Sequence, residues 1–130
     1  RNLTEAFKYV LTIPDVAYRP VAVRYMAGLA AGQGKSTPNT ETMVGYCREL
    51  PETYRMDCIK GFSHGLLEHG TPDKEHEEAL AFCKAEALSE DERNACYEYV
   101  LGTLRGWYIE PRADAICASV KPSLQHLCAK

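Results

Sequence analysis

The chain has 130 residues, of which 45% are hydrophobic and 25% charged, an ordinary composition for a soluble globular protein. We therefore treat residues 1–130 as one domain, long enough to bury a core without help from a metal. The formal net charge is −3, and Lys and Arg are scattered rather than clustered, which argues against a nucleic-acid partner. No apolar run approaches the ~20 residues that span a membrane, so we expect no direct membrane insertion.

A first helical hairpin is expected at about 3–33, with its turn near Pro14. The chain begins at Arg1, without an initiator Met or a signal peptide. Either a leader has been removed or the chain is a fragment of a longer protein. The cysteines described below favour a removed leader, because they indicate export.

Residues 33–37, Gln-Gly-Lys-Ser-Thr, resemble part of a phosphate-binding loop. The complete motif needs a glycine five positions before Gly34, where this chain has Leu29, and it must follow a strand. We therefore interpret residues 33–37 as the end of a helix followed by a linker.

The second hairpin, expected at about 40–70, ends in the densest group of possible metal ligands. His64 and Glu68 are four residues apart and share a helical face, whereas His69 lies about 140° around the helix from His64. His64, Glu68 and His69 form a candidate metal or haem-iron site if the turn after Gly70 brings His69 to the pair. The alternative is a polar helix end, where the helix dipole favours a cationic His69.

The third and fourth hairpins are expected at about 74–109 and 112–130. Residues 89–92, Ser-Glu-Asp-Glu, form a capping-box pattern that predicts the start of a helix in the third hairpin. Tyr97 and Tyr99 in this helix cannot both face the core, and the sequence leaves open which of them does.

Six cysteines fall in three pairs, separated by ten, twelve and ten residues. These spacings are too wide for the close ligand pairs of most zinc sites. If one straight helix joined the partners of the first pair, their Cα atoms would lie about 16 Å apart, whereas a disulfide needs about 7 Å or less. Each interval contains a predicted chain reversal. We therefore predict three disulfides within hairpins: Cys47–Cys58, Cys83–Cys96 and Cys117–Cys128.

Three structural disulfides predict an oxidising compartment, and hence a periplasmic or secreted protein. The alternative is a cytosolic protein with six buried thiols.

Glycines recur along the chain, since Gly28, Gly65 and Gly102 are 37 residues apart both times. Pairs of glycines four residues apart also occur in dimerising membrane helices, but that interpretation needs an apolar 20-residue segment. Close packing between neighbouring hairpins explains the glycines better. We expect a larger residue at Gly65 or Gly102 to overpack this contact.

The first and third hairpins can be aligned without a gap, 74 residues apart. This alignment places Tyr9 and Ala22 at the positions of Cys83 and Cys96. The first hairpin is therefore predicted to be the same unit without a disulfide.

A helical hairpin that repeats about every 34–38 residues resembles tetratricopeptide repeats. It more closely resembles the Sel1-like repeats of disulfide-bridged, cysteine-rich secreted bacterial proteins. Residues 28–34, Gly-Leu-Ala-Ala-Gly-Gln-Gly, are similar to the end of a Sel1-like second helix, although the cysteine spacing here is wider. The resemblance implies a short α-solenoid whose concave face binds another protein or peptide. Some disulfide-bridged members are also described as binding or slowly hydrolysing β-lactams.

Aromatic and Arg side chains are abundant in the later hairpins, and such residues are the usual anchors of protein interfaces. The alternative is that most of them are amphipathic residues at the rim of the core. The candidate partner-binding residues are Trp107, Tyr108, Arg105, Tyr54 and Arg55.

The sequence contains no Ser-x-x-Lys and no Gly-x-Ser-x-Gly motif, and the adjacent Ser63 and His64 would point about 100° apart on a helix. We predict an all-α, short α-solenoid of about four hairpins that needs no cofactor. Its predicted role is an exported, non-catalytic module for protein–protein interaction, or an accessory subunit of a larger assembly. The alternatives are a metal- or haem-binding periplasmic protein and an enzyme acting on β-lactams or cell-wall material.

Overall fold

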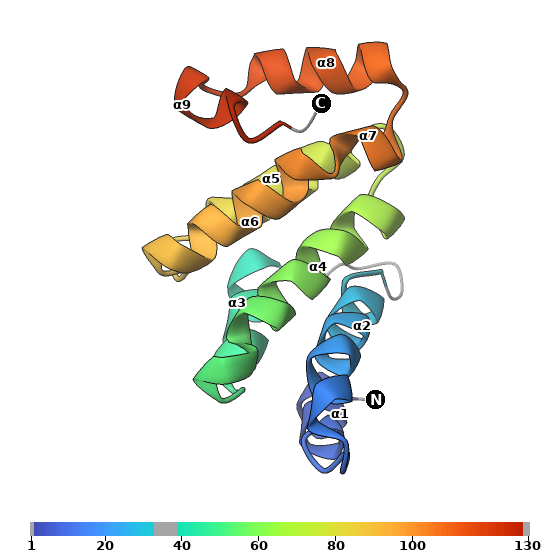
Figure 1. The fold of residues 1–130 in the computed structure, drawn as a ribbon, viewed down its shortest axis with the longest axis vertical. Helices are drawn as coiled ribbons and strands as arrows, with labels where there is room; N and C mark the ends of the chain where they lie inside the picture. Colours follow the sequence, from blue (N-terminus) through green and yellow to red (C-terminus); the bar gives the residue numbers. More distant parts are fainter. Residues whose placement is uncertain (1, 33–38, 129–130) are drawn as a thin grey trace.

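The computed structural model describes residues 2–32 and 39–128, and these residues form helices joined by turns (Figure 1). The predicted all-α class is confirmed. No helix in the described part of the chain is both long and apolar enough to cross a membrane. The α-helices are α1 (Leu3–Val10), α2 (Arg19–Gly32), α3 (Thr40–Arg48), α4 (Arg55–His69), α5 (Glu75–Cys83), α6 (Glu90–Gly102), α7 (Leu104–Trp107), α8 (Glu110–Ser119) and α9 (Pro122–Gln125), and the short 3-10 helices are η1 (Val16–Tyr18) and η2 (Glu52–Tyr54).

The hairpins follow one another in chain order along the long axis of the molecule, with α4 between α2 and the α5–α6 pair (Figure 1). Helix α1 packs on α2, α3 on α4 and α5 on α6. The fourth hairpin begins at Glu110, two residues before its predicted start. Residues 33–37, whose sequence resembles part of a phosphate-binding loop, lie outside the described residues. Buried side chains from Leu3 to Cys128 form one hydrophobic cluster, so every hairpin contributes to the same core.

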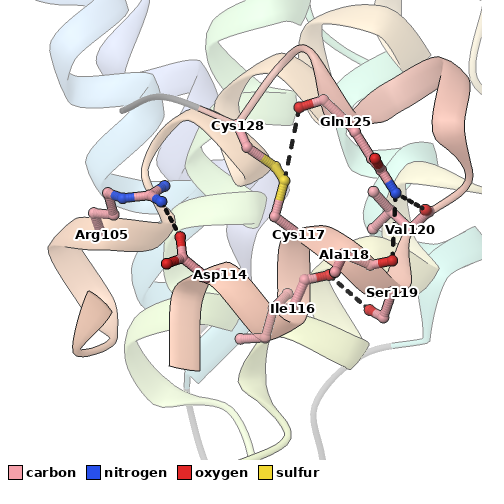
Figure 2. The surroundings of a disulfide bond; sticks show 9 residues. All are labelled: Arg105, Asp114, Ile116, Cys117, Ala118, Ser119, Val120, Gln125 and Cys128. Atoms are coloured by element: carbon pink, nitrogen blue, oxygen red, sulfur yellow. Dashed lines mark hydrogen bonds and ion pairs between the residues drawn. A yellow bond between two sulfur atoms is a disulfide. The ribbon is translucent and has the colours of Figure 1, made fainter. Parts of the chain in front are cut away.

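All three predicted disulfides are confirmed. The Cα–Cα distances are 5.5 Å for Cys47–Cys58, 5.4 Å for Cys83–Cys96 and 6.3 Å for Cys117–Cys128. The first four cysteines are fully buried, whereas the third disulfide lies nearer the surface, where Cys128 is 9% exposed. Figure 2 shows this third disulfide joining α8 to the chain that follows α9.

A side-chain hydrogen bond closes the turn in each hairpin. In the second hairpin, Nε of Arg55 donates to the carbonyl oxygen of Leu50 at 3.0 Å. In the third, Nη2 of Arg93 donates to the carbonyl oxygen of Leu88 at 3.2 Å. Both arginines lie five residues after the acceptor and three residues before a cysteine. Each bond satisfies a carbonyl in the turn between the two helices of the hairpin.

The outer hairpins contain the same turn-closing bond. Nε of Arg19 donates to the carbonyl oxygen of Ile13 at 2.8 Å. In the fourth hairpin a glutamine replaces the arginine, and Nε2 of Gln125 donates to the carbonyl oxygen of Val120 at 3.0 Å (Figure 2). The four hairpins therefore share the same kind of turn-closing hydrogen bond as well as the same helix–turn–helix order.

Burial departs by one residue from the predicted alignment of the first and third hairpins. Tyr9, which it places at a cysteine position, is 76% exposed. Val10 and Val23 are 1% and 0% exposed, and they are 13 residues apart, like the cysteines of the third hairpin. The alignment matched glycines, whereas burial sets the register of a helix. Val10 and Val23 are therefore the buried counterparts of the two cysteines, although Arg19 and Arg93, which close the two turns, keep the predicted spacing of 74 residues.

Glycines let α2 and α4 approach closely. A Cβ atom on Gly65 would lie 2.8 Å from Cα of Gly28 and 2.7 Å from Cβ of Ala31, which is too close for real atoms. Overpacking at Gly65 is thus expected, as the sequence predicts. The prediction for Gly102 is wrong. A Cβ there would meet, among the described residues, just the carbonyl oxygen of Leu127 at 3.8 Å, an ordinary contact.

An ion pair joins the second hairpin to the third. Nη1 and Nη2 of Arg48 lie 2.6 and 2.5 Å from the two carboxylate oxygens of Glu92. Glu92 is 7% exposed, and it also completes the predicted capping box with Ser89 at the start of α6. The hydrogen bond from Arg48 lowers the pKa of Glu92, and burial opposes this effect.

Candidate functional site

Large hydrophobic side chains are exposed mainly on the first hairpin. Among residues 2–32 and 39–128, seven such side chains are exposed, and six of them lie between Tyr9 and Leu29. Four recur at steps of three or four residues along one side of α2 and the turn before it. The small residues that pack on α4 lie on a different side of the helix. We use the term α2 stripe for these four residues: Tyr18, Val21, Tyr25 and Leu29.

Part of the α2 stripe lines a pocket of about 350 Å³, formed by α2, α4 and α6. Gly61 lies in this pocket, and a Cβ on it would be 2.8 Å from Cβ of Ala27, so the close contact of α2 with α4 also shapes the pocket. We refer to it as the His64 pocket, and its lining residues are Val21, Arg24, Tyr25, Lys60, Gly61, His64 and Tyr99.

Contacts from two other helices hold His64 at the edge of this pocket. Its Nδ1 lies 2.7 Å from the hydroxyl of Tyr99 on α6, and its ring packs edge-on against Trp107 of α7, with the ring centres 5.2 Å apart. Tyr97 is 8% exposed and faces the core, so Tyr99 is the outward tyrosine that the sequence leaves undecided. Burial raises the pKa of Tyr99, and the nearby charge of Arg24 lowers it. The charge of Glu68 has the opposite effect to that of Arg24 on this pKa.

The predicted metal ligands meet at one carboxylate. Nε2 of His64 and Nε2 of His69 each lie 3.4 Å from Oε1 of Glu68. No group of three or more His, Cys, Asp or Glu side chains in the described ranges is arranged to hold a metal ion. Both imidazoles thus share one carboxylate, and metal binding stays a prediction.

The predicted partner-binding residues lie at different contacts between helices. Trp107 is beside the His64 pocket through its contact with His64. Tyr108 instead donates from its hydroxyl to Oε1 of Glu75 at 2.9 Å and accepts from the backbone N–H of His76 at 3.1 Å. Burial, followed by the bond to Glu75, raises the pKa of Tyr108 to about 12. Tyr108 therefore connects α5 to the end of α7.

The remaining three candidates are also engaged within the chain or at its turns. Arg105 forms an ion pair with Asp114 of α8 (Figure 2). Arg55 makes the turn-closing bond of the second hairpin, and Tyr54 is the half-buried residue just before it. The structure thus brings Trp107 to the pocket but does not bring the five residues together.

Ser63 and His64 do not form a nucleophile and its base. The Ser63 hydroxyl is fully buried and donates to the carbonyl oxygen of Ile59 at 2.9 Å, while His64 turns toward Tyr99. Their divergence agrees with the angle expected for neighbours on a helix.

Compared with protein-family models, curated proteins and solved structures, the chain shows no match in any of the three. Its class therefore rests on its own structure: an all-α protein of helical hairpins, three of which contain a disulfide.

Sequence reasoning missed the α2 stripe. Val21, Tyr25 and Leu29 recur at steps of four on a different side of α2 from Ala27 and Ala31, but the sequence does not show which side α4 covers.

Proposed function

We propose that this chain is an exported, non-catalytic protein-binding module, and that its binding surface is the α2 stripe together with the His64 pocket. The observation that carries the proposal is the concentration of exposed large hydrophobic side chains on this one hairpin, next to a pocket. Isolated exposed hydrophobic residues are normal, but a continuous apolar surface beside a hollow is typical of an interaction site.

Two further features support the proposal. Three disulfides suit an oxidising compartment, and hence a periplasmic or secreted protein. The shared turn-closing bond supports an origin by repetition of one hairpin, and repeat proteins of stacked hairpins commonly bind partners along an extended surface. The resemblance to Sel1-like repeats points to the same role.

Site-specific cross-linking tests the proposal. A photoreactive amino acid replaces Tyr25 in one sample and Ile109 in another. Ile109 is the matched control because it is 75% exposed and lies outside the α2 stripe. Both proteins are incubated, with their disulfides intact, with the periplasmic and secreted proteins of the source organism. We expect the photoreactive amino acid at position 25 to capture a specific protein that the one at position 109 does not capture.

The captured protein is then purified and its affinity for three variants is measured by calorimetry. Val21→Asp and Tyr25→Asp should weaken binding at least about tenfold, while Ile109→Asp should leave it unchanged. A partner that binds all three variants equally, or cross-links that are the same from both positions, would rule out this surface.

A further inference from the structure

The charge of the His64 pocket differs from that of the whole chain. The protein has a formal net charge of −3, yet the pocket is lined by Arg24, Lys60 and His64 and, among the described residues, by no carboxylate. Basic and aromatic side chains thus meet in one hollow of an acidic protein. Asp57 and Glu68 contact Arg24 and His64 from outside this lining, which leaves Lys60 as the cation of the lining with no acidic partner among the described residues, and this favours an anionic occupant.

The two permanent cations of the pocket are available to a ligand. The ammonium group of Lys60 forms no ion pair or hydrogen bond with any residue in the described ranges, although its side chain is half-buried. Arg24 forms a long ion pair with Asp57, at 3.7 Å, and its side chain stays 48% exposed. An approaching carboxylate would therefore gain two cationic partners without displacing a strong internal ion pair.

The opposite wall of the pocket is apolar. Val21 and Tyr25 are 51% and 64% exposed and continue into the α2 stripe outside the pocket. The volume of about 350 Å³ is at the small end for ligand sites, so it suits a few side chains better than a large cofactor. The stripe offers further apolar contact to a longer chain.

We propose that the occupant of the His64 pocket is an acidic segment of the partner protein, in which a carboxylate lies next to an aromatic or aliphatic side chain. The carboxylate binds between Lys60 and Arg24, and the apolar side chain packs on Val21 and Tyr25. This assignment rests on the proposed function, and it adds the chemistry by which the partner is recognised.

Short synthetic peptides test the assignment with the disulfide-intact protein. The probe peptide alternates Glu with Phe and Leu, and the two comparison peptides have Gln or Lys in place of each Glu. Binding is followed by the NMR shifts of Val21, Tyr25 and Lys60. We expect the Glu peptide to bind at least about tenfold more tightly than the Gln peptide, with the difference shrinking as salt is added.

Charge-reversing variants locate the effect. Lys60→Glu should weaken binding of the Glu peptide about tenfold and favour the Lys peptide. Lys84→Glu makes the same change of net charge at an exposed lysine that lines a different pocket, and it should bind like the wild type. Equal binding of the Glu and Gln peptides, or equal weakening by both variants, would overturn the assignment.

Three other outcomes would also overturn it in favour of a different occupant or none. If phenylacetate binds as tightly as the peptide and depends on Lys60, the pocket takes small aromatic acids. If the sedimentation coefficient rises with protein concentration and Lys60→Glu abolishes the rise, the occupant is a second copy of the chain. If Tyr25 still captures a specific protein while charge has no effect, the ligand chemistry fails and the proposed function stands.

Discussion

The first hairpin has no disulfide and packs on the second with backbone against backbone, whereas the fourth has a disulfide and packs loosely on the third. Between α2 and α4, Gly61 and Gly65 leave no room for a Cβ atom. Beside α9, by contrast, lie two hollows of about 520 Å³ each, both lined by Tyr97, Lys121 and Leu124. Helix α8 buries Ala113 and Ile116, and α9 buries no side chain fully.

A terminal hairpin can therefore be ordered either by close packing, as the first hairpin is, or by a disulfide, as the fourth hairpin is. A short hairpin that buries few side chains gains little hydrophobic free energy, and a disulfide compensates by restricting the unfolded chain. The glycine contact needs no such restraint, because it brings α2 and α4 close enough for many van der Waals contacts.

The largest effect should come from breaking the glycine contact. Gly65→Ala places a methyl group against the backbone of α2, where neither helix can yield without moving the other. We expect a loss of about 3–4 kcal/mol in the free energy of unfolding, larger than the gain in helix propensity. Urea denaturation of the oxidised protein measures this loss. A change below about 1 kcal/mol would show that the two helices separate easily.

The next effect should come from Arg48, at the joint between the second and third hairpins. Arg48→Met leaves Glu92 as a buried carboxylate without its partner, and we expect a loss of about 2–3 kcal/mol at neutral pH. This value is discounted because the Arg48 side chain is 34% exposed. Glu92→Gln, which retains a capping side chain, completes a double-mutant cycle that isolates the coupling between the two residues.

The pH dependence of the Arg48→Met effect has a definite sign. Arg48 lowers the pKa of Glu92 in the folded protein, so the pair stabilises the fold above the unfolded pKa of Glu, about 4.3. That stability is lost as the pH falls through the lower folded pKa. The difference in unfolding free energy between wild type and Arg48→Met should therefore narrow under acid conditions. A constant difference from neutral pH to about pH 3 would contradict the pairing.

A smaller and more local effect should follow from removing the third disulfide. With Ser in place of both Cys117 and Cys128, we expect a loss of about 2 kcal/mol, confined to α8 and α9. Hydrogen exchange should show faster exchange there and unchanged protection in α4. The matched control replaces the fully buried Cys83 and Cys96, and it should reduce protection throughout the core. The same pattern in both variants would mean that the fourth hairpin is packed as firmly as the others.

The parts of the structure that sequence reasoning predicts well are determined locally. The disulfide pairs and the capping box at Ser89 each depend on residues within one hairpin. The α2 stripe is exposed because α1 and α4 cover a different side of α2. The sequence does not show which side is covered, since Val21 and Val23 are the same residue type. Their exposures of 51% and 0% differ because α1 and α4 cover just one side of α2.

The predicted binding residues illustrate the same limit. Trp107 lies beside the pocket, but the sequence could not show that the hydroxyl of Tyr108 is engaged by Glu75 or that Arg55 closes its own turn. A side chain of the type that anchors interfaces is equally suited to internal bonds, and tertiary neighbours decide between the two uses. The five-residue spacing between Leu50 and Arg55, repeated from Leu88 to Arg93, was the available sign of an internal role.

The smallest expected effect is a stabilisation at Gly102, and it separates a glycine that packing requires from one that it does not. The space beside Gly102 admits a Cβ at ordinary contact distance, so Gly102→Ala should raise the free energy of unfolding by about 0.5–1 kcal/mol through helix propensity and a less flexible unfolded chain. Gly106→Ala is the control, since a Cβ there would meet no described atom within 4 Å. Because Gly28, Gly65 and Gly102 are evenly spaced in the sequence, opposite signs for Gly65→Ala and Gly102→Ala would establish that the spacing marks one close contact rather than a repeated one. Equal destabilisation by the two substitutions would instead place a close neighbour against α6, as the spacing alone suggests.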